Sequence, residues 1–294
     1  MSAGIATETD QALLQTWPLP SPEGSQSKED RGRVLVIAGS LHVPGAALLS
    51  GEAALRAGAG KLAVGVPQDI ALPVGLALPE AKVLPLPKTA AGSSTSSSAL
   101  EHTAARADGV LLGPGMEDTQ SLRSMVKRLS PILDCPLVAD AGAIAGFHQP
   151  HALRHCPILT PHAGEMASLL DVDIEQVHTR GAEIALQVAA NLNVLVVLKG
   201  PVTWIAAADG RLWVHRGGCT GLGTSGSGDV LAGLIVGLIA RGASVEQASA
   251  WGVWLHGRAG ELLSSEIGSV GFLARELAAW VPKLLDEVAG ADAH

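Results

Sequence analysis

The glycine-rich segment from Gly223 to Asp229, with the sequence GTSGSGD, holds residue types suited to phosphate chemistry. Small residues let backbone N–H groups turn toward a ligand, and the apolar run that begins at Val230 predicts a helix. Because the amino end of a helix carries a positive dipole, this helix start is predicted to bind a phosphoryl group during its transfer. The predicted anion hole consists of Gly226, Ser227 and Gly228.

Asp229 lies at the mouth of the predicted anion hole. A carboxylate there can accept the proton of a substrate hydroxyl while that hydroxyl attacks phosphorus, so Asp229 is the candidate catalytic residue. The alternative is that Asp229 only stabilises the first turn of the helix. The segment is not a Walker A loop, because G-x-x-x-x-G-K-[ST] is absent, and it opens no strand–helix–strand unit of the dinucleotide-binding type.

A second polar group is the sequence TPHAGE, from Thr160 to Glu165. His162 and Glu165 are three residues apart at a predicted helix start, so their side chains are expected to share a face. Glu165 is a candidate for holding Mg²⁺ through water molecules, and His162 is a candidate contact for a phosphate or an amide. The alternative is a capping box, with Thr160 at the cap and Glu165 in the first turn.

A third group, Lys199 to Thr203 with the sequence KGPVT, ends one predicted strand and begins a hairpin. The backbone of this turn is suited to hold an adenine nucleotide, with Lys199 near one of its phosphates. A lysine at a strand end is often only solvated, so the position of Lys199 leaves both interpretations open.

The elements that would position these groups alternate along the chain. Short apolar strands are expected at 33–38, 61–66, 110–112, 136–139, 157–159 and 194–198, and helices at 44–59, 119–130, 175–192, 229–241, 245–263 and 272–289. This alternation predicts an α/β fold with a mostly parallel central sheet and helices on both faces. Asp209-Gly210 between two apolar runs predicts an antiparallel hairpin at the edge of the sheet, in the C-terminal third.

Ligands of such sheets bind outside the carboxyl ends of the strands, so the turns that follow the strands should share one edge. These turns are Gly39-Ser40, Gly113-Pro114-Gly115, Asp140, Thr160-Pro161-His162 and Lys199-Gly200. Residues 1–30 are predicted to be a loosely structured lead-in with a short docking helix at 11–17, and residues 31–290 a single catalytic domain. Residues 88–98 (KTAAGSSTSSS) are expected to form a mobile surface loop.

The composition of the 294-residue chain excludes several classes of protein. The net charge is −8, and the basic runs that mark nucleic-acid and anionic-membrane binders are absent from the sequence. The longest apolar run, 230–240, is too short to span a bilayer. Three cysteines without a C-x-x-C pair argue against a disulfide framework and a structural zinc site. With no signal-peptide pattern at its N-terminus, the chain is expected in the cytoplasm.

The motifs and their order resemble those of the ADP/ATP-dependent NAD(P)H-hydrate dehydratases, which have the ribokinase-like fold. The resemblance runs from about Arg33 to Val281. It is carried by VLVIAGSLHVPGAALLSGEAALRAGAGKLAVGVP (34–67), LLGPGM (111–116), VADAGAIA (138–145), ILTPHAGEMASLL (158–170), VLKGPVT (197–203) and GTSGSGDVLAG (223–233). The set PGAALL, GPG, TPH-x-GE and KG-x-x-T is specific to that family, whereas GSGD is shared by all ribokinase-like kinases.

The resemblance implies a repair reaction that uses ADP or ATP with Mg²⁺. The S-epimer of hydrated NADH or NADPH would be phosphorylated on its ring hydroxyl and would then lose phosphate, which restores the reduced cofactor. By position, the hydrate pocket would be lined by Ala46, Gly115, His162 and Asp229. The adenine nucleotide would be bound by Lys199, Gly200, Pro201, Val202, Thr203 and Gly228.

The chain departs from the family pattern at two positions. Ala163 replaces the proline of TPHPGE, and Cys219 follows Gly218 where the family usually has an Asn, which puts the contact of that Asn in question. The resemblance also implies a homo-oligomer, for example a tetramer. It implies a separate epimerase as well, because thirty residues are too few to hold the epimerase domain that some relatives carry at their N-terminus.

Two other functions would use the same residues. A ribokinase-like kinase for a vitamin-precursor alcohol would use Asp229 and the anion hole identically, but it would need a small closed acceptor pocket rather than a long cleft. A nucleotide sensor built on an inactive kinase scaffold would bind nucleotide without turnover. The presence of Asp229, Glu165 and the glycines argues against the sensor.

Overall fold

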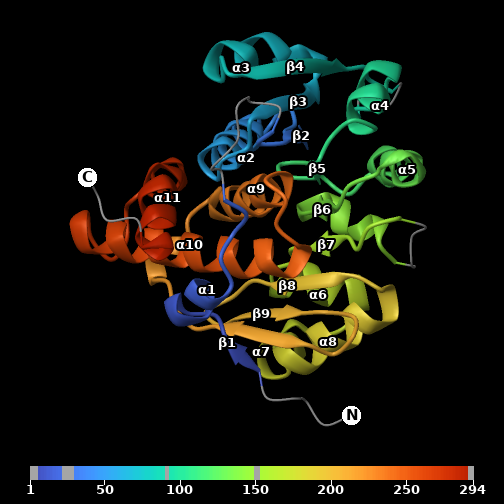
Figure 1. Cartoon of the computed structure of the whole chain (residues 1–294). Coiled ribbons are helices and arrows are strands. Elements are labelled where there is room, and N and C mark those ends of the chain that lie inside the picture. The colour runs from blue at the N-terminus through green and yellow to red at the C-terminus, as the bar shows by residue number, and fades with distance from the viewer. Residues whose placement is uncertain (1–5, 22–29, 90–92, 149–152, 291–294) are drawn as a thin grey trace.

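The computed structural model describes residues 6–21, 30–89, 93–148 and 153–290. Ten strands within these ranges form one sheet in the order β1-β10-β9-β8-β7-β6-β5-β2-β3-β4 (Figure 1). The strands are β1 (Thr7–Glu8), β2 (Arg33–Ile37), β3 (Lys61–Pro67), β4 (Ala81–Leu86), β5 (Gly109–Leu112), β6 (Leu137–Ala139), β7 (Ile158–Leu159), β8 (Leu195–Leu198), β9 (Thr203–Ala206) and β10 (Leu212–His215).

The α-helices are α1 (Gln11–Thr16), α2 (Gly45–Arg56), α3 (Ala71–Ala77), α4 (Ser98–Ala104), α5 (Gln120–Leu129), α6 (Ala163–Leu170), α7 (Ile174–Thr179), α8 (Gly181–Leu192), α9 (Ser227–Ala240), α10 (Val245–Glu266) and α11 (Ala274–Ala289). Short 3₁₀ turns are η1 (Gln68–Ile70), η2 (Ser130–Ile132), η3 (Ala141–Gly146) and η4 (Thr220–Leu222). None of the helices in the described part of the chain has the length and apolar character that a membrane span needs.

The sheet is mostly parallel, as the sequence predicts. All pairings from β4 through β3, β2, β5, β6 and β7 to β8 are parallel, and β9 is antiparallel to both β8 and β10. The predicted antiparallel hairpin is therefore confirmed as β9–β10. It does not form the outer edge, because β1 pairs parallel with β10 on its far side.

Helices cover both faces of the sheet because successive residues of a strand point to opposite sides. Val34 and Val36 of β2 belong to one hydrophobic core, whereas Leu35 and Ile37 belong to the other. Helices α2, α9, α10 and α11 contribute to the first core, and α4, α5 and α8 contribute to the second. The predicted three-layer α/β architecture is confirmed.

The N-terminal segment differs from its prediction. A loose lead-in with a short docking helix is predicted over residues 1–30, and the structure adds β1 to it: residues 6–21 lie in β1, α1 and the chain that follows. The short docking helix predicted at 11–17 is confirmed as α1, whose amino end is capped by Asp10. Residues 1–5 and 22–29 lie outside the described residues.

Long-range contacts hold residues 6–21 against the rest of the protein. Leu14 of α1 is fully buried, and Trp17 stacks on Trp213 of β10 with ring centroids 6.0 Å apart. The carbonyl of Trp17 accepts a hydrogen bond from Trp251 Nε1 at 2.9 Å. Apolar burial and the edge of β10 therefore order a segment that has little periodic pattern of its own.

Two further predicted segments are the helix at 175–192 and the loop at 88–98. The single helix predicted over 175–192 is two helices, α7 and α8, which are separated at Arg180, where φ is −122° and ψ is 29°. In the predicted 88–98 loop, Lys88 pairs with Asp69 and Ser96 donates a hydrogen bond to Glu101 at 2.8 Å. Residues 90–92 of this loop lie outside the described residues, and its mobility stays a prediction.

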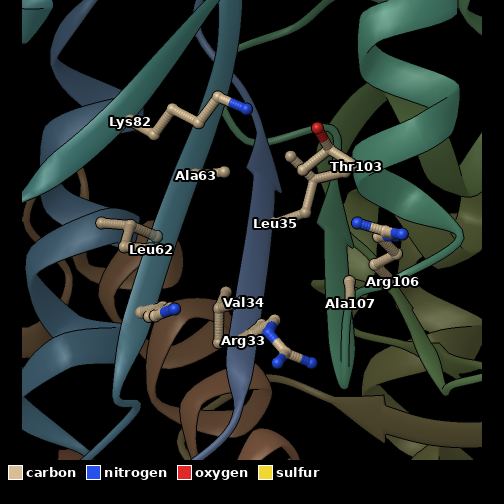
Figure 2. Close-up of a pocket in the computed structure, with 10 residues that line it drawn as sticks. Arg33, Val34, Leu35, Leu62, Ala63, Lys82, Thr103, Arg106 and Ala107 are labelled. Carbon is tan, nitrogen blue, oxygen red and sulfur yellow. The ribbon is translucent and has the colours of Figure 1, made fainter. Parts of the chain in front are cut away.

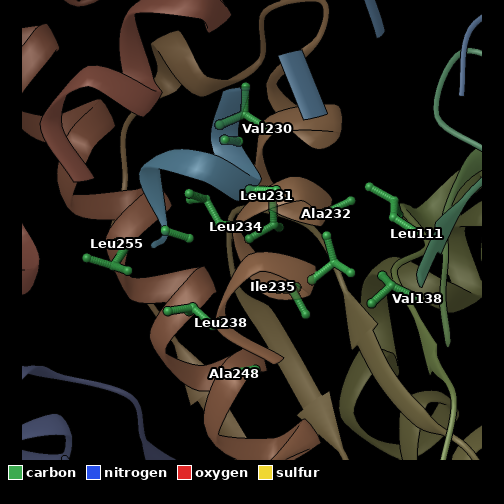
Figure 3. Packing of buried hydrophobic residues seen from close by; sticks show 14 of the residues in the cluster. Leu111, Val138, Val230, Leu231, Ala232, Leu234, Ile235, Leu238, Ala248 and Leu255 are labelled. Carbon is green, nitrogen blue, oxygen red and sulfur yellow. The ribbon is translucent and has the colours of Figure 1, made fainter. Parts of the chain in front are cut away.

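Helix α9 is the element that carries the glycine-rich segment into the core. It is buried along nearly all of its length, and its side chains pack against the sheet residues Leu111 and Val138 (Figure 3). On its other side it approaches α2 closely: a Cβ added at Gly233 would lie 2.3 Å from the Ser50 carbonyl oxygen. A Cβ at Gly237 would lie 2.5 Å from the carbonyl oxygen of Ala54. Backbone-to-backbone contact with α2 thus fixes where α9 begins.

Gly233→Ala tests this close approach. Alanine favours helices, yet we expect the substitution to lower the free energy of unfolding by about 2 kcal/mol, because the methyl group forces α2 and α9 apart. The matched control is Gly75→Ala in α3, where the added Cβ meets only Val83 Cγ2 at 3.4 Å and should stabilise by about 0.5 kcal/mol. Denaturant unfolding measures both variants, and effects of the same sign would contradict the packing.

Candidate active site

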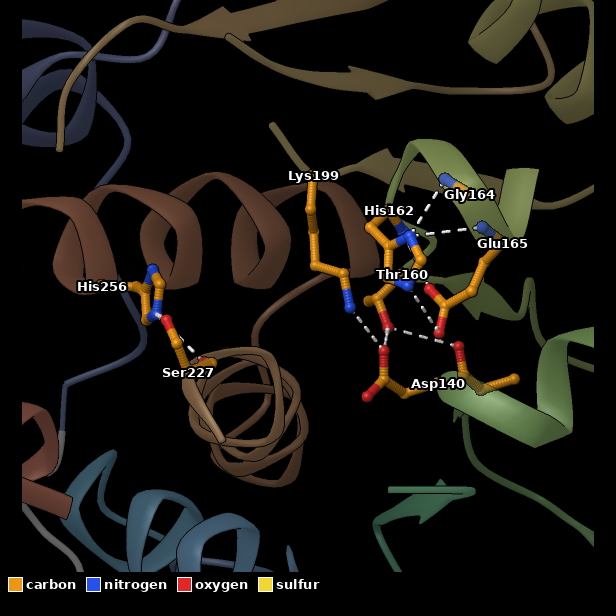
Figure 4. A network of polar contacts seen from close by, with 9 residues as sticks. Asp140, Thr160, His162, Gly164, Glu165, Lys199, Ser227 and His256 are labelled. Carbon is orange, nitrogen blue, oxygen red and sulfur yellow. Dashed lines mark hydrogen bonds and ion pairs between the residues drawn. The ribbon is translucent and has the colours of Figure 1, made fainter. Parts of the chain in front are cut away.

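A buried ion pair lies where three neighbouring strands end. Asp140 follows β6, Thr160 follows β7 and Lys199 follows β8, as Figure 4 shows. Asp140 Oδ1 accepts hydrogen bonds from Thr160 Oγ1 at 2.7 Å and from Lys199 Nζ at 2.8 Å. The Asp140 side chain is 4 % exposed and that of Lys199 17 % exposed, so the pair is shielded from water. The strand ends that the sequence predicts to share an edge are therefore brought together.

Lys199 stays charged in this environment. Burial disfavours the ammonium, but the neighbouring carboxylates of Asp140, Glu165 and Asp229 outweigh burial and raise the pKa of Lys199. A Cβ added at Gly228 would lie 3.2 Å from Lys199 Nζ. The ammonium thus reaches from the end of β8 to the first turn of α9, which places a fixed positive charge beside the predicted anion hole.

Asp229 lies in the first turn of α9 and has an unusual proton affinity. Burial, together with repulsion from Asp140 and Glu165, raises the pKa of Asp229 to about 6, and Lys199 acts in the opposite direction. A carboxylate with a pKa near 6 is ionised at neutral pH and is a stronger base than an ordinary aspartate. This is the property that a group needs to take a proton from a hydroxyl.

The start of α9 has the backbone geometry of an anion site. Its N-cap, Gly226, has φ of +89°, a left-handed conformation that favours glycine, and no side chain of the described residues caps this end. The N–H groups of Gly228 and Asp229 lie in the first turn, where a helix offers them no acceptor. Together with the helix dipole, these groups favour an oxyanion.

His162 and Glu165 form a capping box at the start of α6. His162 Nδ1 accepts from the backbone N–H groups of Gly164 at 3.0 Å and Glu165 at 3.2 Å, and Glu165 Oε2 accepts from the His162 N–H at 2.9 Å. The capping box is therefore real, but His162 rather than Thr160 is its cap. The imidazole is 60 % exposed, and its Nε2 lies 3.6 Å from Glu165 Oε1.

Glu165 is the candidate for Mg²⁺, and the fit is limited. Within the described ranges, no group of three or more His, Cys, Asp or Glu residues is arranged to hold a metal ion. Oε2 of Glu165 is used by the capping box, and Oε1, which lies 3.6 Å from His162 Nε2, is the oxygen that would meet a water molecule of a hydrated cation. Carboxylate chemistry fits Mg²⁺, but most of its ligands would have to be phosphate oxygens and water.

Ala46 and Gly115 lie against each other. Gly115 has φ of +65°, and a Cβ there would lie 2.5 Å from the Ala46 Cβ. The loop after β5 also meets the loop after β2, since Gly39 N donates to the Pro114 carbonyl at 2.8 Å. A Cβ at Gly226 would lie 2.4 Å from Leu49 of α2, so the same helix that begins beside Gly115 contacts the start of α9.

The turn between β8 and β9 carries the other predicted nucleotide contacts. Gly200, Pro201 and Val202 are exposed, and Thr203 begins β9 with its hydroxyl donating to the Gly200 carbonyl at 3.3 Å. Because Lys199 immediately precedes these residues, the turn offers exposed backbone next to a buried cation. Its role in holding a nucleotide stays a prediction.

Two site residues were missed by reasoning from the sequence. Asp140 is predicted only as a strand end, and its partnership with Lys199 links residues 59 positions apart. His256 of α10 is not among the site residues predicted from the sequence, yet its Nε2 lies 2.8 Å from Ser227 Oγ. Burial lowers the pKa of His256 to about 4, so its ring is neutral at physiological pH.

A separate hollow of about 510 Å³ lies away from this edge (Figure 2). It opens at the amino ends of β2 and β3, and the cations Arg33, Lys61, Lys82 and Arg106 are among its lining residues. Arg33, Lys82 and Arg106 are exposed, and the buried side-chain atoms left without a partner in the described part of the chain, Thr9 Oγ1 and His215 Nε2, do not line it. The convergence of titratable groups, not the size of a hollow, therefore identifies the candidate site.

Comparison with known proteins agrees with this site. A family model described as NAD(P)H-hydrate dehydratase matches residues 34–283. The chain belongs to this family. It is 47 % identical over 278 residues to the ADP-dependent (S)-NAD(P)H-hydrate dehydratase of Xanthomonas campestris, covering 94 % of this chain and 95 % of that protein. A Bacillus subtilis protein of the same name is 34 % identical over 271 residues, covering 90 % and 93 %.

Solved structures similar to this chain include members of the same family. The NAD(P)H-hydrate dehydratase of Bacillus subtilis, co-crystallised with ATP and Mg²⁺, superposes with a TM-score of 0.86 at 31 % identity, covering 97 % of this chain and all of that one. The resemblance inferred from the motifs, and the ribokinase-like fold, are thus confirmed. The chain also spans about half the length of the bifunctional NAD(P)H-hydrate repair enzyme of Moorella thermoacetica, at 35 % identity.

The two partners of Asp229 should move its pKa in opposite directions. Lys199→Met removes the attracting cation and should raise the pKa of Asp229 above about 6. Asp140→Asn removes a repelling carboxylate and should lower the pKa of Asp229. The measurement is a carboxyl-carbon NMR titration of Asp229 in each variant. Glu80→Gln, an exposed carboxylate outside the site, serves as the control. Shifts in the same direction for both variants would contradict the assigned electrostatics.

Proposed function

We propose that this chain dehydrates the S-epimer of hydrated NADH or NADPH at the expense of ADP or ATP with Mg²⁺. The observation that carries the proposal is a carboxylate of raised pKa in the first turn of α9, beside the Lys199 ammonium, in a member of the NAD(P)H-hydrate dehydratase family. The relatives from Xanthomonas and Bacillus bear the name of this reaction.

In the first step, Asp229 takes the proton of the ring hydroxyl as the oxygen attacks the terminal phosphorus of the nucleotide. The bond from phosphorus to the bridging oxygen breaks, and ADP leaves when ATP is the donor, or AMP when ADP is the donor. The backbone N–H groups at the start of α9 and the Lys199 ammonium stabilise the charge on the transferring phosphoryl group.

In the second step, the phosphorylated hydroxyl leaves. The ring nitrogen pushes its lone pair toward the C–O bond, phosphate departs, and loss of a proton from the neighbouring carbon restores the double bond of the reduced nicotinamide. Phosphorylation is needed because hydroxide is a poor leaving group and phosphate a good one. Asp229 is thus the catalytic residue in this proposal.

The remaining predicted residues bind and orient the two substrates. Ala46, Gly115 and His162 contact the hydrate, with the exposed Nε2 of His162 as the donor. Gly200, Pro201, Val202 and Thr203 hold the nucleotide through their backbone, with Lys199 and Gly228 at its phosphates. Mg²⁺, reached by Glu165 through water, would neutralise phosphate charge.

The proposal extends to the setting of the enzyme. We infer a homo-oligomer, for example a tetramer, and this is supported by Leu72 and Leu76, two α3 side chains that are 74 % and 76 % exposed. A cytoplasmic location fits the three free cysteines, of which Cys135 is buried.

The alternative, a small-molecule kinase, has weaker support. A hydroxyethylthiazole kinase from Pyrococcus horikoshii superposes with a TM-score of 0.60 at 19 % identity, which shows a common fold alone. The family match extends over residues 34–283 and includes the PGAALL and TPH-x-GE motifs that GSGD kinases need not share.

The direct test is absorbance at the reduced-nicotinamide band after NADH hydrate, Mg²⁺ and either ADP or ATP are added. We expect a nucleotide-dependent rise, and the nucleotide that produces it identifies the donor. Asp229→Asn should keep nucleotide affinity but lower the rate by about 100-fold or more, because the amide cannot accept the proton. No rise with substrate that a known dehydratase converts would reject the dehydratase in favour of the kinase.

A further inference from the structure

Helix α10 packs against α9 and passes beside its start, where His256 meets Ser227. His256 Nε2 lies 2.8 Å from Ser227 Oγ and 3.0 Å from the Ser227 carbonyl oxygen (Figure 4). Ser227 is buried and is the first residue of α9, directly between the N-cap Gly226 and Gly228.

One ring tautomer satisfies both contacts. A carbonyl oxygen can only accept, so with its hydrogen on Nε2 the ring donates toward the two oxygens of Ser227, and we assign this tautomer. The Ser227 hydroxyl oxygen is then the acceptor toward the ring. Its own hydrogen is free to point to a different acceptor, and a phosphoryl oxygen held by the same helical turn is such an acceptor.

Other α10 residues hold the segment that leads into this turn. Glu261 Oε1 accepts from the Gly218 N–H at 2.9 Å, and Cys219 Sγ donates to the Gly260 carbonyl at 3.2 Å. A Cβ added at Gly260 would lie 2.6 Å from the Leu222 side chain. Gly260 and Glu261 follow His256 by four and five positions, so neighbouring turns of α10 hold the chain from Gly218 to Ser227.

Cys219 takes part in this contact with α10. The family pattern usually has Asn here, and in this chain the thiol itself reaches a backbone carbonyl of α10. The thiol therefore links the 218–222 segment to α10, and a thiol is a weak donor.

We propose that His256 is a positioning residue of the phosphoryl site: its Nε2–H fixes Ser227, so that the serine hydroxyl and the N–H groups of the first α9 turn face the terminal phosphoryl group of the nucleotide. This inference rests on the proposed function for the identity of that group. His256 itself touches neither substrate, and it acts through Ser227.

Two amide substitutions separate this role from simple packing. In His256→Gln the side-chain NH₂ can reach the place of the imidazole Nε2, whereas in His256→Asn the amide is one methylene shorter and reaches only the place of Nδ1. We expect calorimetric titration to show ADP affinity lowered about tenfold in His256→Asn and within about twofold of wild type in His256→Gln. AMP lacks the terminal phosphoryl group, so its affinity should not change in either variant.

A control variant separates the loss of the His256–Ser227 contact from a general loosening of α10. Ser249→Ala, which removes a buried hydroxyl from the same helix that bonds only to Val245, controls for loosening of α10. Thermal unfolding of each variant establishes that it is folded at the assay temperature. Equal loss in the Gln and Asn variants, or equal loss of ADP and AMP, would overturn the proposal. Because binding is measured without hydrate, failure of the proposed reaction would leave this test unaffected.

Where the wild type turns over hydrate, a kinetic split gives a second readout. His256→Asn should lower kcat and raise KM for the nucleotide, while KM for the hydrate should change less, since Ala46, Gly115 and His162 lie on other elements than α9. His256→Gln should restore both parameters. A change confined to KM for the hydrate would also overturn the proposal.

Discussion

The ion pair between Lys199 and Asp140 is the interaction on which the rest of the site depends. A lysine ammonium and a carboxylate that is nearly removed from water are each costly to bury alone, and removing one partner of such a pair typically costs about 3–5 kcal/mol. The pair exists only if β6, β7 and β8 end at the same edge in register. Once formed, it places a fixed positive charge between the sheet and α9. Burial raises the pKa of Asp229 most, and the two members of the pair act on that pKa in opposite directions, Asp140 upward and Lys199 downward. The same contact thus bears on the stability of the edge and on the reactivity of the site.

The second constraint is the placement of α9. A helix start with no side-chain cap is unfavourable unless a ligand or a neighbour satisfies it, and this one begins at a left-handed glycine. Close backbone contact with α2 through Gly233 and Gly237, and the His256–Ser227 contact with α10, hold the helix start without filling it with side chains. The buried apolar body of α9 therefore supplies the rigidity, and its glycine-rich end remains available to a phosphoryl group.

The features that could be predicted from the sequence are those that a pattern of neighbouring residues encodes. The GTSGSGD segment, the short apolar strands and the Asp209-Gly210 hairpin each carry their signal within a few residues, and the structure has all three. β1 could not be predicted, because two residues carry no periodicity and pairing with β10 is what makes them a strand. β4 was missed because Pro85 interrupts its pattern, which an edge strand tolerates. The links from Asp140 to Lys199 and from Ser227 to His256 join residues 59 and 29 positions apart, so only the folded topology brings them together.

The central claim is that Asp229, tuned by the buried ion pair, is the base of the reaction. The measurement that tests it most directly is the pH dependence of kcat/KM with limiting nucleotide, in the wild type and in Asp229→Asn. The wild type should lose activity on the acid side with a single ionisation of pKa about 6, while the residual rate of Asp229→Asn should lack that ionisation. The same acid limb in both proteins would contradict the claim, because another group would then be the one that must lose its proton.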